Sequence, residues 1–442
     1  DINLKKYNFK NIKSYQNILD DKHINTKQWW VLKNIPKRKL EINNKNQIFD
    51  QIESLLEKST KEQLISDVPI GVFLSGGVDS SLILSQIVKN KSNVDTFNIG
   101  FDFKEYDESE DANKIAKIFK TNHNHYVCNK NEAISMIDKI NDAFSEPFAD
   151  SSQIPTMLVS QIARKKVKVI LGGDGGDEIF GGYNRYLLAN KYWKYLKYFP
   201  KPFNLIFSAH KILPKNLIFK IFYNYFNLSG FSKNKISTYN KILNKIEKIH
   251  SRQSFYENLV VEWSDDNIFN EKISNKENHG GLYSDKNLNF EEWMMSVDFN
   301  TYLPDDILCK VDRSSMLFSL EARSPFLNKD LIEFVYNLPF EFKINNQITK
   351  WSSKKILEKY LPKELIYKSK QGFGVPLAEW FRNELKDYVY DNLSKKSCDK
   401  HNFFNYKVIQ QTLDNHYNRN INSEFKIWSL IQFNSWYNKF IH

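Results

Sequence analysis

The chain has 442 residues, of which 41% are hydrophobic and 15% aromatic, so it can bury a sizeable core. This composition excludes a disordered chain and a collagen-like chain, and the length predicts one long domain or two. The net charge is +11, but only eight of the 63 basic residues are arginine, and the lysines are scattered. Nucleic-acid surfaces gather basic residues and rely on arginine, so we interpret the excess as solvated surface and expect no nucleic-acid partner.

The three cysteines, Cys128, Cys309 and Cys398, lie far apart in the sequence. They form no Cys-x-x-Cys pair, so we expect neither a disulfide scaffold nor a thiolate metal site, and a reducing compartment fits. No segment carries the roughly 18 to 20 apolar residues that a spanning helix needs, which predicts no membrane association. The chain begins with Asp1 and has no signal peptide, so we expect a cytoplasmic piece of a longer protein.

Composition and periodicity divide the chain into four predicted parts. Residues 1–45 are polar and weakly periodic and form an N-terminal segment. Residues 46–186 alternate short apolar runs with helical spacing, as in an α/β core. Residues 187–290 are aromatic, lysine-rich and helix-like, which predicts a helical insertion. Residues 291–442 predict a helical C-terminal part, because the strand pattern does not return there.

The α/β core is predicted to contain four strands, at residues 68–74, 94–101, 123–127 and 167–171. Helical spacing predicts helices before and between them, at residues 48–56, 81–89, 112–119, 132–144 and 154–165. Strands that alternate with helices in this way predict a doubly wound parallel sheet covered by helices on both faces. Ligands of such sheets bind beyond the carboxyl ends of the strands, so we expect the chemistry to follow Leu74, Phe101 and Leu171.

The first predicted strand runs into Ser75–Ser81, which reads Ser-Gly-Gly-Val-Asp-Ser-Ser. A strand that enters a helix through two glycines exposes successive backbone N–H groups, which form an anion cradle with the helix N-terminus. No lysine precedes the last serine, so the loop is not the P-loop of nucleoside triphosphatases. Asp79 beside a phosphate site is a natural Mg²⁺ ligand, and a plain glycine–serine turn with an aspartate cap is the alternative.

The last predicted strand runs into a second loop, Gly172–Glu178, in which four glycines are interleaved with three acidic residues. Glycines let the backbone approach a ligand closely. A bare cluster of carboxylates would repel phosphates, so a divalent cation is needed to make the arrangement favourable. We assign Asp79 and Asp177 to that cation, and a structural or Ca²⁺-type acidic turn is the alternative.

A third candidate lies far downstream, at residues 368–376, where Lys370 stands beside a glycine-rich loop that ends in proline. A lysine held rigidly by such a loop can stabilise charge that builds up on phosphorus or on an acyl oxygen. Taken alone, the loop is better interpreted as an ordinary surface loop.

The loop Ser75–Ser81 resembles the pyrophosphate loop of the N-type ATP pyrophosphatases, which cleave ATP to AMP and pyrophosphate. All three motifs in this order resemble the synthetase domain of glutamine-dependent asparagine synthetases, over about residues 46–440. This resemblance implies a doubly wound fold of the adenine-nucleotide α-hydrolase type. The connecting segments that support it are 146–152, 302–308, 311–313 and 320–325.

The resemblance implies ATP and Mg²⁺ as cofactors and gives roles to individual positions. Mg²⁺ falls on Asp79 and Asp177, Asp174 acts on the incoming amine, and Lys370 stabilises the adenylation transition state. Many family members carry glutamate where this chain has Asp174, which shortens the side chain by one methylene. The positions implied to bind the nucleotide are Leu74, Ser75, Gly76, Gly77, Val78, Asp79, Ser80, Ser81, Ile99, Gly172 and Gly173.

The resemblance also implies the reaction of the synthetase half of a glutamine-hydrolysing asparagine synthetase, a carbon–nitrogen ligase of asparagine biosynthesis. The side-chain carboxylate of aspartate attacks the α-phosphorus of ATP, pyrophosphate leaves, and ammonia converts β-aspartyl-AMP into asparagine and AMP. In the family, a glutaminase domain releases the ammonia from glutamine, and residues 1–45 are expected to be the end of such a domain. We expect free ammonia, and not free glutamine, to support the reaction of this chain. Whether the chain forms a homodimer stays open.

Three other functions remain open at this point. A related amidotransferase could act on another carboxylate, such as a peptide or saccharide acid. A tRNA-modifying ligase could use the same loop, although the paired cysteines typical of thiolating members are absent from the sequence. A non-catalytic binding or assembly module is the third. The sequence leaves open the acceptor, the ammonia source, the role of residues 187–290 and the residues that bind the aspartate α-carboxylate.

Overall fold

The computed structural model describes residues 30–32, 35, 44–101, 109–187, 193, 249, 251–263, 266–270, 288–368 and 374–441. The chain divides into two compact units, residues 1–39 and residues 40–442. In the first unit, the Ile35 N–H donates to the Leu32 carbonyl at 3.1 Å. Everything that follows concerns the second unit, which contains the sheet and all three sequence motifs.

A five-stranded parallel sheet lies at the centre of this unit, with the strand order β3-β2-β1-β4-β5. Its strands are β1 (Ile70–Phe73), β2 (Asp95–Phe101), β3 (Asn122–Cys128), β4 (Val169–Leu171) and β5 (Glu321–Arg323). The first four confirm the strands predicted from the apolar runs. The parallel order, with helices between the strands, confirms the predicted doubly wound α/β fold.

The fifth strand was missed by the sequence analysis, which expected only helices after residue 291. Strand β5 pairs with β4 in parallel, with Val169 opposite Glu321 and Leu171 opposite Arg323. Its three residues are polar or small and contain no apolar run, so no periodicity marks them. The Arg323 side chain also donates to the main-chain carbonyls of Gln63 (2.7 Å) and Ile65 (2.9 Å), which fixes the strand by contacts remote in sequence.

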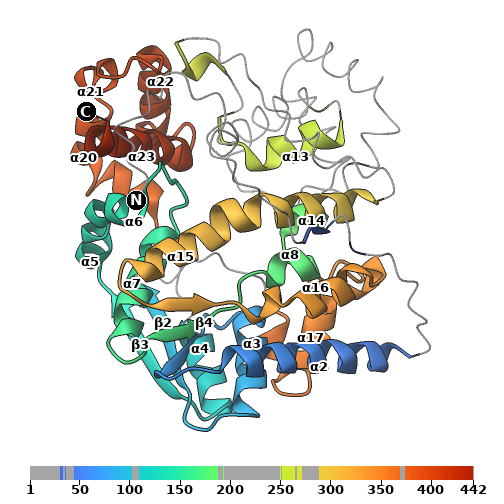
Figure 1. The fold of residues 1–442 in the computed structure, drawn as a ribbon. Coiled ribbons are helices and arrows are strands. Elements are labelled where there is room, and N and C mark those ends of the chain that lie inside the picture. Colours follow the sequence, from blue (N-terminus) through green and yellow to red (C-terminus); the bar gives the residue numbers. More distant parts are fainter. Residues whose placement is uncertain are drawn as a thin grey trace, which may run out of the picture. The chain divides into compact units, whose positions relative to one another are not determined.

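Helices cover both faces of the sheet, as Figure 1 shows. Connections between neighbouring parallel strands are right-handed, so the helices that link β1, β2 and β3 lie on one face and those that link β3, β4 and β5 lie on the other. Accordingly α2 packs on α3, α4 packs on β2 and β3, and α15 packs on α7 and β5. The helices of this core are α2 (Lys45–Gln63), α3 (Val78–Val88), α4 (Ser109–Ile118), α5 (Lys130–Ser135), α6 (Ile140–Ala143), α7 (Gln153–Arg164), α8 (Gly176–Phe180), α14 (Phe290–Asn300), α15 (Cys309–Met316), α16 (Lys329–Tyr336) and α17 (Trp351–Leu357).

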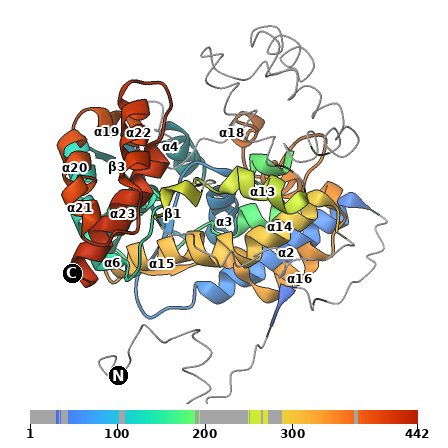
Figure 2. The same cartoon turned by 90° about the horizontal axis from the view of Figure 1, so that it is seen from above.

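The C-terminal helices form a bundle at one end of the unit, as Figure 2 shows. Their shared core contains the fully buried side chains of Trp380, Phe381 and Trp428, and it is continuous with the core over β2 and α7. The remaining helices are α13 (Arg252–Val260), α18 (Lys363–Ile366), α19 (Leu377–Arg382), α20 (Lys386–Asn392), α21 (Lys395–Asp399), α22 (Tyr406–Tyr417) and α23 (Glu424–Phe440). Most of the predicted insertion at 187–290 lies outside the described residues.

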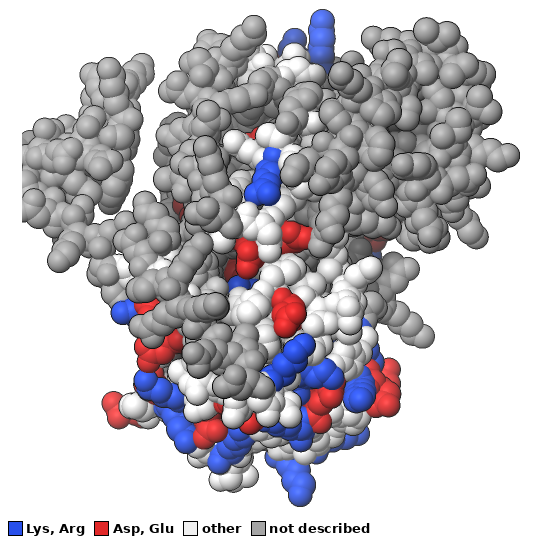
Figure 3. Space-filling view, turned by 90° about the vertical axis from the view of Figure 1, so that its right-hand side faces the viewer, with Lys and Arg blue, Asp and Glu red and all other residues white. Residues whose placement is uncertain are grey.

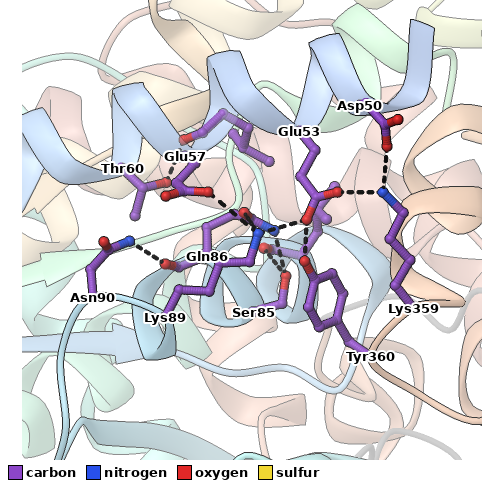
Figure 4. Close-up of polar contacts among 12 residues, drawn as sticks. Asp50, Glu53, Glu57, Thr60, Ser85, Gln86, Lys89, Asn90, Lys359 and Tyr360 are labelled. Atoms are coloured by element: carbon purple, nitrogen blue, oxygen red, sulfur yellow. Dashed lines mark hydrogen bonds and ion pairs between the residues drawn. The ribbon is translucent and has the colours of Figure 1, made fainter. Parts of the chain in front are cut away.

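A buried carboxylate, Glu53, ties α2 to the far end of α3 and to the residues after α17 (Figure 4). Glu53 accepts hydrogen bonds from Lys89 at 2.6 Å, from Lys359 at 2.7 Å and from the Tyr360 hydroxyl. Burial raises the pKa of Glu53, but these three donors outweigh it and lower the pKa to about 2. This group is therefore charged at neutral pH and fully provided with donors.

The described helices include none with the length and apolar character needed to cross a bilayer. On the face shown in Figure 3, lysine and arginine residues are interspersed with aspartate and glutamate over the lower part of the molecule. Neither sign of charge forms a separate patch in that region.

Candidate active site

The two motif-bearing loops lie side by side at the point where the sheet topology reverses. Strands β1 and β4 are paired, with Val72 opposite Leu171. From β1 the chain winds towards β2 and β3, whereas from β4 it winds the other way to β5. Ligands of doubly wound sheets bind at this kind of reversal, beyond the carboxyl ends of the strands. The structure therefore brings together the first two motifs of the sequence.

Serine hydroxyls shape the first loop, Ser75–Ser81. The Ser75 hydroxyl accepts from the Gly77 N–H at 3.2 Å and lies 3.1 Å from the Ser80 hydroxyl, and the Ser81 hydroxyl donates to the Gly77 carbonyl at 2.7 Å. Gly76 has a φ of 82°, a left-handed conformation that favours glycine. Helix α3 begins directly after Gly77, which has no side chain to cap it, so its first N–H groups face the loop as an anion-binding end.

Glycines in the second loop allow Asp79 to lie against the backbone. A Cβ atom at Gly173 would come within 2.8 Å of the Asp79 Cβ, and one at Gly176 within 2.6 Å of the Asp79 carboxyl carbon. Gly175 has a φ of 87°, and its conformation turns the chain into α8. The interleaved glycines are therefore required by the close contact between the two loops.

A lysine that the sequence analysis did not single out joins the two loops. The Lys350 ammonium forms an ion pair with Asp79 and another with Asp177 Oδ1, at 2.6 Å. The Lys350 side chain is 8% exposed, and those of Asp79 and Asp177 are 14% and 18% exposed. Burial lowers the pKa of Lys350, but the two carboxylates outweigh it and raise the pKa. Two carboxylates thus share one buried cation beside the first loop, Ser75–Ser81.

The surrounding backbone is adapted to this lysine. Lys350 precedes α17 and has a φ of 52°, an uncommon left-handed conformation for a residue with a side chain. A Cβ atom at Gly182 would lie 2.2 Å from the Lys350 Cε and 1.8 Å from Asp177 Oδ1. Any other residue at 182 would displace one of these groups. Strained conformations and such close approaches cluster at functional sites.

The pair Asp79 and Asp177 fits a Mg²⁺ site of the kind that binds together with a nucleotide. Mg²⁺ usually takes one or two carboxylates and completes its coordination with phosphate oxygens and water. Within the described part of the chain, no group of three or more His, Cys, Asp or Glu side chains could hold a metal. The two carboxylates already surround one cationic atom, so the position favours a cation, and a phosphate bound in the adjacent anion cradle would supply the further oxygen ligands.

Two further acids of the second loop have raised pKa values. Burial raises the pKa of Asp174 to about 6, with Lys310 opposing the shift. Burial also raises the pKa of Glu178 to about 7, although the Tyr183 hydroxyl donates to this carboxylate at 2.5 Å. A carboxyl group that titrates near neutrality can take up and release protons during a reaction, whereas an ordinary aspartate cannot do so efficiently.

The residues predicted for the nucleoside lie near the same edge of the sheet. The Leu74 N–H donates to the Phe97 carbonyl at 2.9 Å, and the Leu74 carbonyl accepts from Asn98 Nδ2 at 3.0 Å. Ile99 is buried in β2, and the Gly172 N–H donates to the Arg323 carbonyl at 2.9 Å. Their predicted contacts with a nucleotide stay predictions.

The third motif is described only in part. Lys370 lies within residues 369–373, outside the described residues, so its place beside Asp79 and Asp177 stays a prediction. Lys368, at the start of the motif, forms an ion pair with Asp111 of α4. Of the three charged groups predicted to converge, the structure brings the two aspartates together.

Sequence reasoning missed Lys350 because nothing in the sequence marks it. It follows residues 345–349, a mostly polar stretch that forms a tight turn, and a lysine after such a turn is usually exposed. Lys310, which influences Asp174, was missed for the same reason, since it is one lysine among many on a predicted helix. A signal could have come only from knowing that these helices pack against the two loops.

Comparisons with known proteins agree with the motifs. The family model described as asparagine synthase matches residues 51–438. A glutamine-hydrolysing asparagine synthetase of Bacillus subtilis is 29% identical over 400 residues, which cover 89% of this chain and 59% of that protein. A putative glutamine-hydrolysing asparagine synthetase of Methanocaldococcus jannaschii is 33% identical over 301 residues, or 68% of this chain and 54% of the relative.

A more distant relative carries a different description. The amidase chry2 of Gibberella zeae is 22% identical over 428 residues, which cover 88% of this chain and 62% of that protein. The chain thus spans less than two thirds of the length of each of these three curated relatives.

Proposed function

The chain belongs to the asparagine synthase family, and from this premise we propose that it uses ATP to activate a carboxylate and then transfers ammonia to it. The product is an amide, and the acceptor that we propose is the side-chain carboxylate of aspartate. The observation that carries this proposal is the convergence of Asp79 and Asp177 on one cation position, directly beside the N-terminus of α3.

Activation is the first proposed step, because a carboxylate oxygen is too poor a leaving group for ammonia to displace. A carboxylate oxygen of the acceptor forms a bond to the α-phosphorus of ATP, and the bond between that phosphorus and pyrophosphate breaks. The N–H groups at the start of α3 and the hydroxyls of Ser75, Ser80 and Ser81 are suited to hold the departing pyrophosphate. Mg²⁺ held by Asp79 and Asp177 would neutralise charge on the phosphates.

Two lysines have proposed roles in this step. Lys350 pairs with both aspartates, so its ammonium would lie close to the bound phosphates. There it would offset part of the negative charge of the phosphates. Lys370 is proposed, from the family resemblance, to stabilise the negative charge on phosphorus in the transition state. A fixed ammonium at such a position typically contributes on the order of 10² to 10³ in rate.

Amide formation is the second proposed step. Ammonia attacks the acyl carbon of the acyl-adenylate, the nitrogen loses a proton, and AMP leaves with its electron pair. Asp174 is the proposed acceptor of that proton. Its position in the second loop and its pKa of about 6 support this role, because it is mostly ionised at neutral pH and still basic enough to act.

The test separates the two steps. Exchange of labelled pyrophosphate into ATP reports the first step and needs no ammonia, whereas amide formation from ammonium chloride reports both. We expect exchange that depends on Mg²⁺ and is fastest with aspartate in a panel that includes peptide and saccharide acids. Exchange that is fastest with another carboxylate would favour a related amidotransferase with a different acceptor, and no exchange with any acid would refute the ligase proposal.

A further inference from the structure

The ammonium of Lys350 lies where the proposed metal ion would bind. It pairs with Asp79 and lies 2.6 Å from Asp177 Oδ1, so it stands between the two carboxylates that we assign to Mg²⁺. A Mg²⁺ ion on the same carboxylates would approach their oxygens to about 2.1 Å. Two cations at such short range repel each other strongly in a buried site, because little solvent screens them. The ammonium and the metal ion therefore compete for one position.

The backbone that carries Lys350 is held firmly. The Trp351 N–H, which follows it, donates to the Lys343 carbonyl at 2.9 Å. Asn345 and Ile348 close the preceding turn with two hydrogen bonds between their main chains, at 3.0 and 2.8 Å. The left-handed φ of Lys350 persists because the surrounding structure fixes it. Any exchange of the ammonium for a metal ion is therefore made by the side chain alone.

The Lys350 side chain has a second anionic partner within its range when phosphate binds. Asp79 lies in the first turn of α3, so the ammonium that pairs with it lies beside the anion-binding end of that helix. Lysine places its charge on a flexible four-carbon stem, which allows the ammonium to turn from the aspartates to bound phosphate oxygens. A nucleotide thus supplies oxygens for the metal ion and, at the same time, a new partner for Lys350.

Each partial exchange at this site is unfavourable. The Lys350 side chain is 8% exposed, so a metal ion that displaced the ammonium without phosphate would leave a buried cation separated from its carboxylates. If the ammonium instead withdrew without a metal ion, Asp79 and Asp177 would lose the charge that balances them. Buried charges are costly unless they are paired, so the arrangement favours the joint arrival of metal ion and phosphate.

We infer that Lys350 is an internal counter-ion that keeps free metal ions off Asp79 and Asp177 until the phosphates of a nucleotide arrive. Metal ion and nucleotide then bind as one unit, and the free energy of binding one depends on the other. This inference rests on the proposed function, because it concerns how the ligands enter the same site. A chain without the Lys350 ammonium should bind the metal ion alone.

Binding of Mn²⁺ in the absence of nucleotide tests the inference. Mn²⁺ shares the preference of Mg²⁺ for oxygen ligands, and its free concentration is measured by electron paramagnetic resonance. Lys350→Met removes the charge and keeps an unbranched side chain. It should bind Mn²⁺ at least about 30-fold more tightly than the wild type, because truncating one partner of a buried charge pair leaves the other unbalanced and the metal ion restores that balance. Equal affinity in the two proteins overturns the inference.

Two further variants locate the effect. Lys354 lies one turn later on α17, with its ammonium 5.6 Å from the centre of the Tyr367 ring, so Lys354→Met is the matched control for loss of one positive charge. It should change the affinity for Mn²⁺ by less than about fivefold. The double variant Lys350→Met with Asp177→Asn should lose the tight binding, because one of the two carboxylates is gone. Tight binding that persists in the double variant overturns the inference, because the ion then lies elsewhere.

The thermal stability of the wild type gives a second reading that needs no substitution. A ligand that binds the folded state raises Tm according to its binding free energy. Mn²⁺ alone should leave the Tm of the wild type nearly unchanged, whereas Mn²⁺ with inorganic pyrophosphate should raise it by more than the sum of their separate shifts. In Lys350→Met, Mn²⁺ alone should raise Tm. Merely additive shifts in the wild type overturn the inference.

The outcomes separate this inference from the proposed function, because both measurements report binding and need no turnover. Joint binding of Mn²⁺ and pyrophosphate in a wild type that shows no pyrophosphate exchange with any acid would refute the ligase reaction and support the counter-ion role. Normal exchange in a wild type that binds Mn²⁺ alone as tightly as Lys350→Met would refute the counter-ion role and leave the reaction intact.

Discussion

The two ends of helix α3 hold buried charge in opposite ways. At its C-terminal end, one carboxylate, Glu53, accepts from two lysines and a tyrosine, and its pKa falls to about 2 (Figure 4). At its N-terminal end, two carboxylates, Asp79 and Asp177, share the single ammonium of Lys350. Both ends are buried, and they differ in arrangement: one carboxylate lies between two lysines at one end, whereas one lysine lies between two carboxylates at the other.

This difference distinguishes charge that supports the fold from charge that is kept for a ligand. The Glu53 group is complete within the chain, and nothing would be gained there by binding a further cation. Around the second loop, burial raises the pKa values of Asp174 and Glu178 to about 6 and 7. The neighbouring donors and cations therefore do not offset the effect of burial on these two carboxyl groups. Strongly raised carboxyl pKa values at a topological switch are typical of functional sites.

The largest effect should follow from removing a carboxylate at the N-terminal end of α3. Asp79→Ala and Asp177→Asn are each expected to lower aspartate-dependent pyrophosphate exchange by about 10³ or more, because the proposed cation loses half of its protein ligands. The melting temperature should shift by only a few degrees. Glu57→Gln, an acid on the neighbouring helix α2, is the control for a general loss of negative charge. A variant that retains a third of the wild-type exchange rate would refute the assignment.

A somewhat smaller loss is expected from Lys370→Ala, on the order of 10² to 10³ in the exchange rate with little change in KM for ATP. The reason is that the proposed ammonium acts on charge that develops only in the transition state. Lys368→Ala is a matched control from the same motif, since Lys368 pairs with Asp111 on the surface of α4. Equal losses in the two variants would mean that the loop matters for structure and that Lys370 has no special role.

The acid at 174 should separate the two steps by their pH dependence. Its pKa is raised to about 6, so the ionised form that can accept a proton prevails above that pH and disappears below it. Amide formation by the wild type should therefore fall about tenfold per pH unit below 6, while exchange should not share this limb. Asp174→Asn should lower amide formation about 10² to 10⁴-fold and remove the limb, with exchange largely kept. A limb that persists in Asp174→Asn belongs to another group.

Much of the fold and half of the site geometry could be predicted from the sequence because they depend on local patterns. The strands β1 to β4 are continuous apolar runs, and the two glycine-rich loops follow directly from strand ends. The convergence of Asp79 with Asp177 follows from the rule that parallel strands end at one edge. Strand β5 and Lys350 depend instead on packing between segments remote in sequence: β5 is paired with β4, and Lys350 reaches Asp79 across 271 residues. No local period or spacing encodes such contacts.

The smallest effect on activity and the clearest effect on stability should come from the C-terminal end of α3. Glu53→Gln keeps the shape of the side chain but leaves Lys89 and Lys359 without their shared carboxylate. We expect a loss of about 1–3 kcal/mol in the free energy of unfolding at pH 7, measured by urea denaturation, with pyrophosphate exchange within about twofold of the wild type.

The pH dependence of that loss tests its cause. The pKa of Glu53 is about 2 in the folded chain, below the value of 4.5 for an unperturbed glutamate, so ionisation stabilises the folded state. The stabilisation is complete above pH 4.5 and is lost as the pH falls from 4.5 towards 2. The difference between wild type and Glu53→Gln should therefore be constant from pH 7 to about pH 5 and shrink below it. A difference that stays unchanged at pH 3 would show that Glu53 stabilises the chain by packing and not by charge, and the contrast between the two ends of α3 would then not be electrostatic.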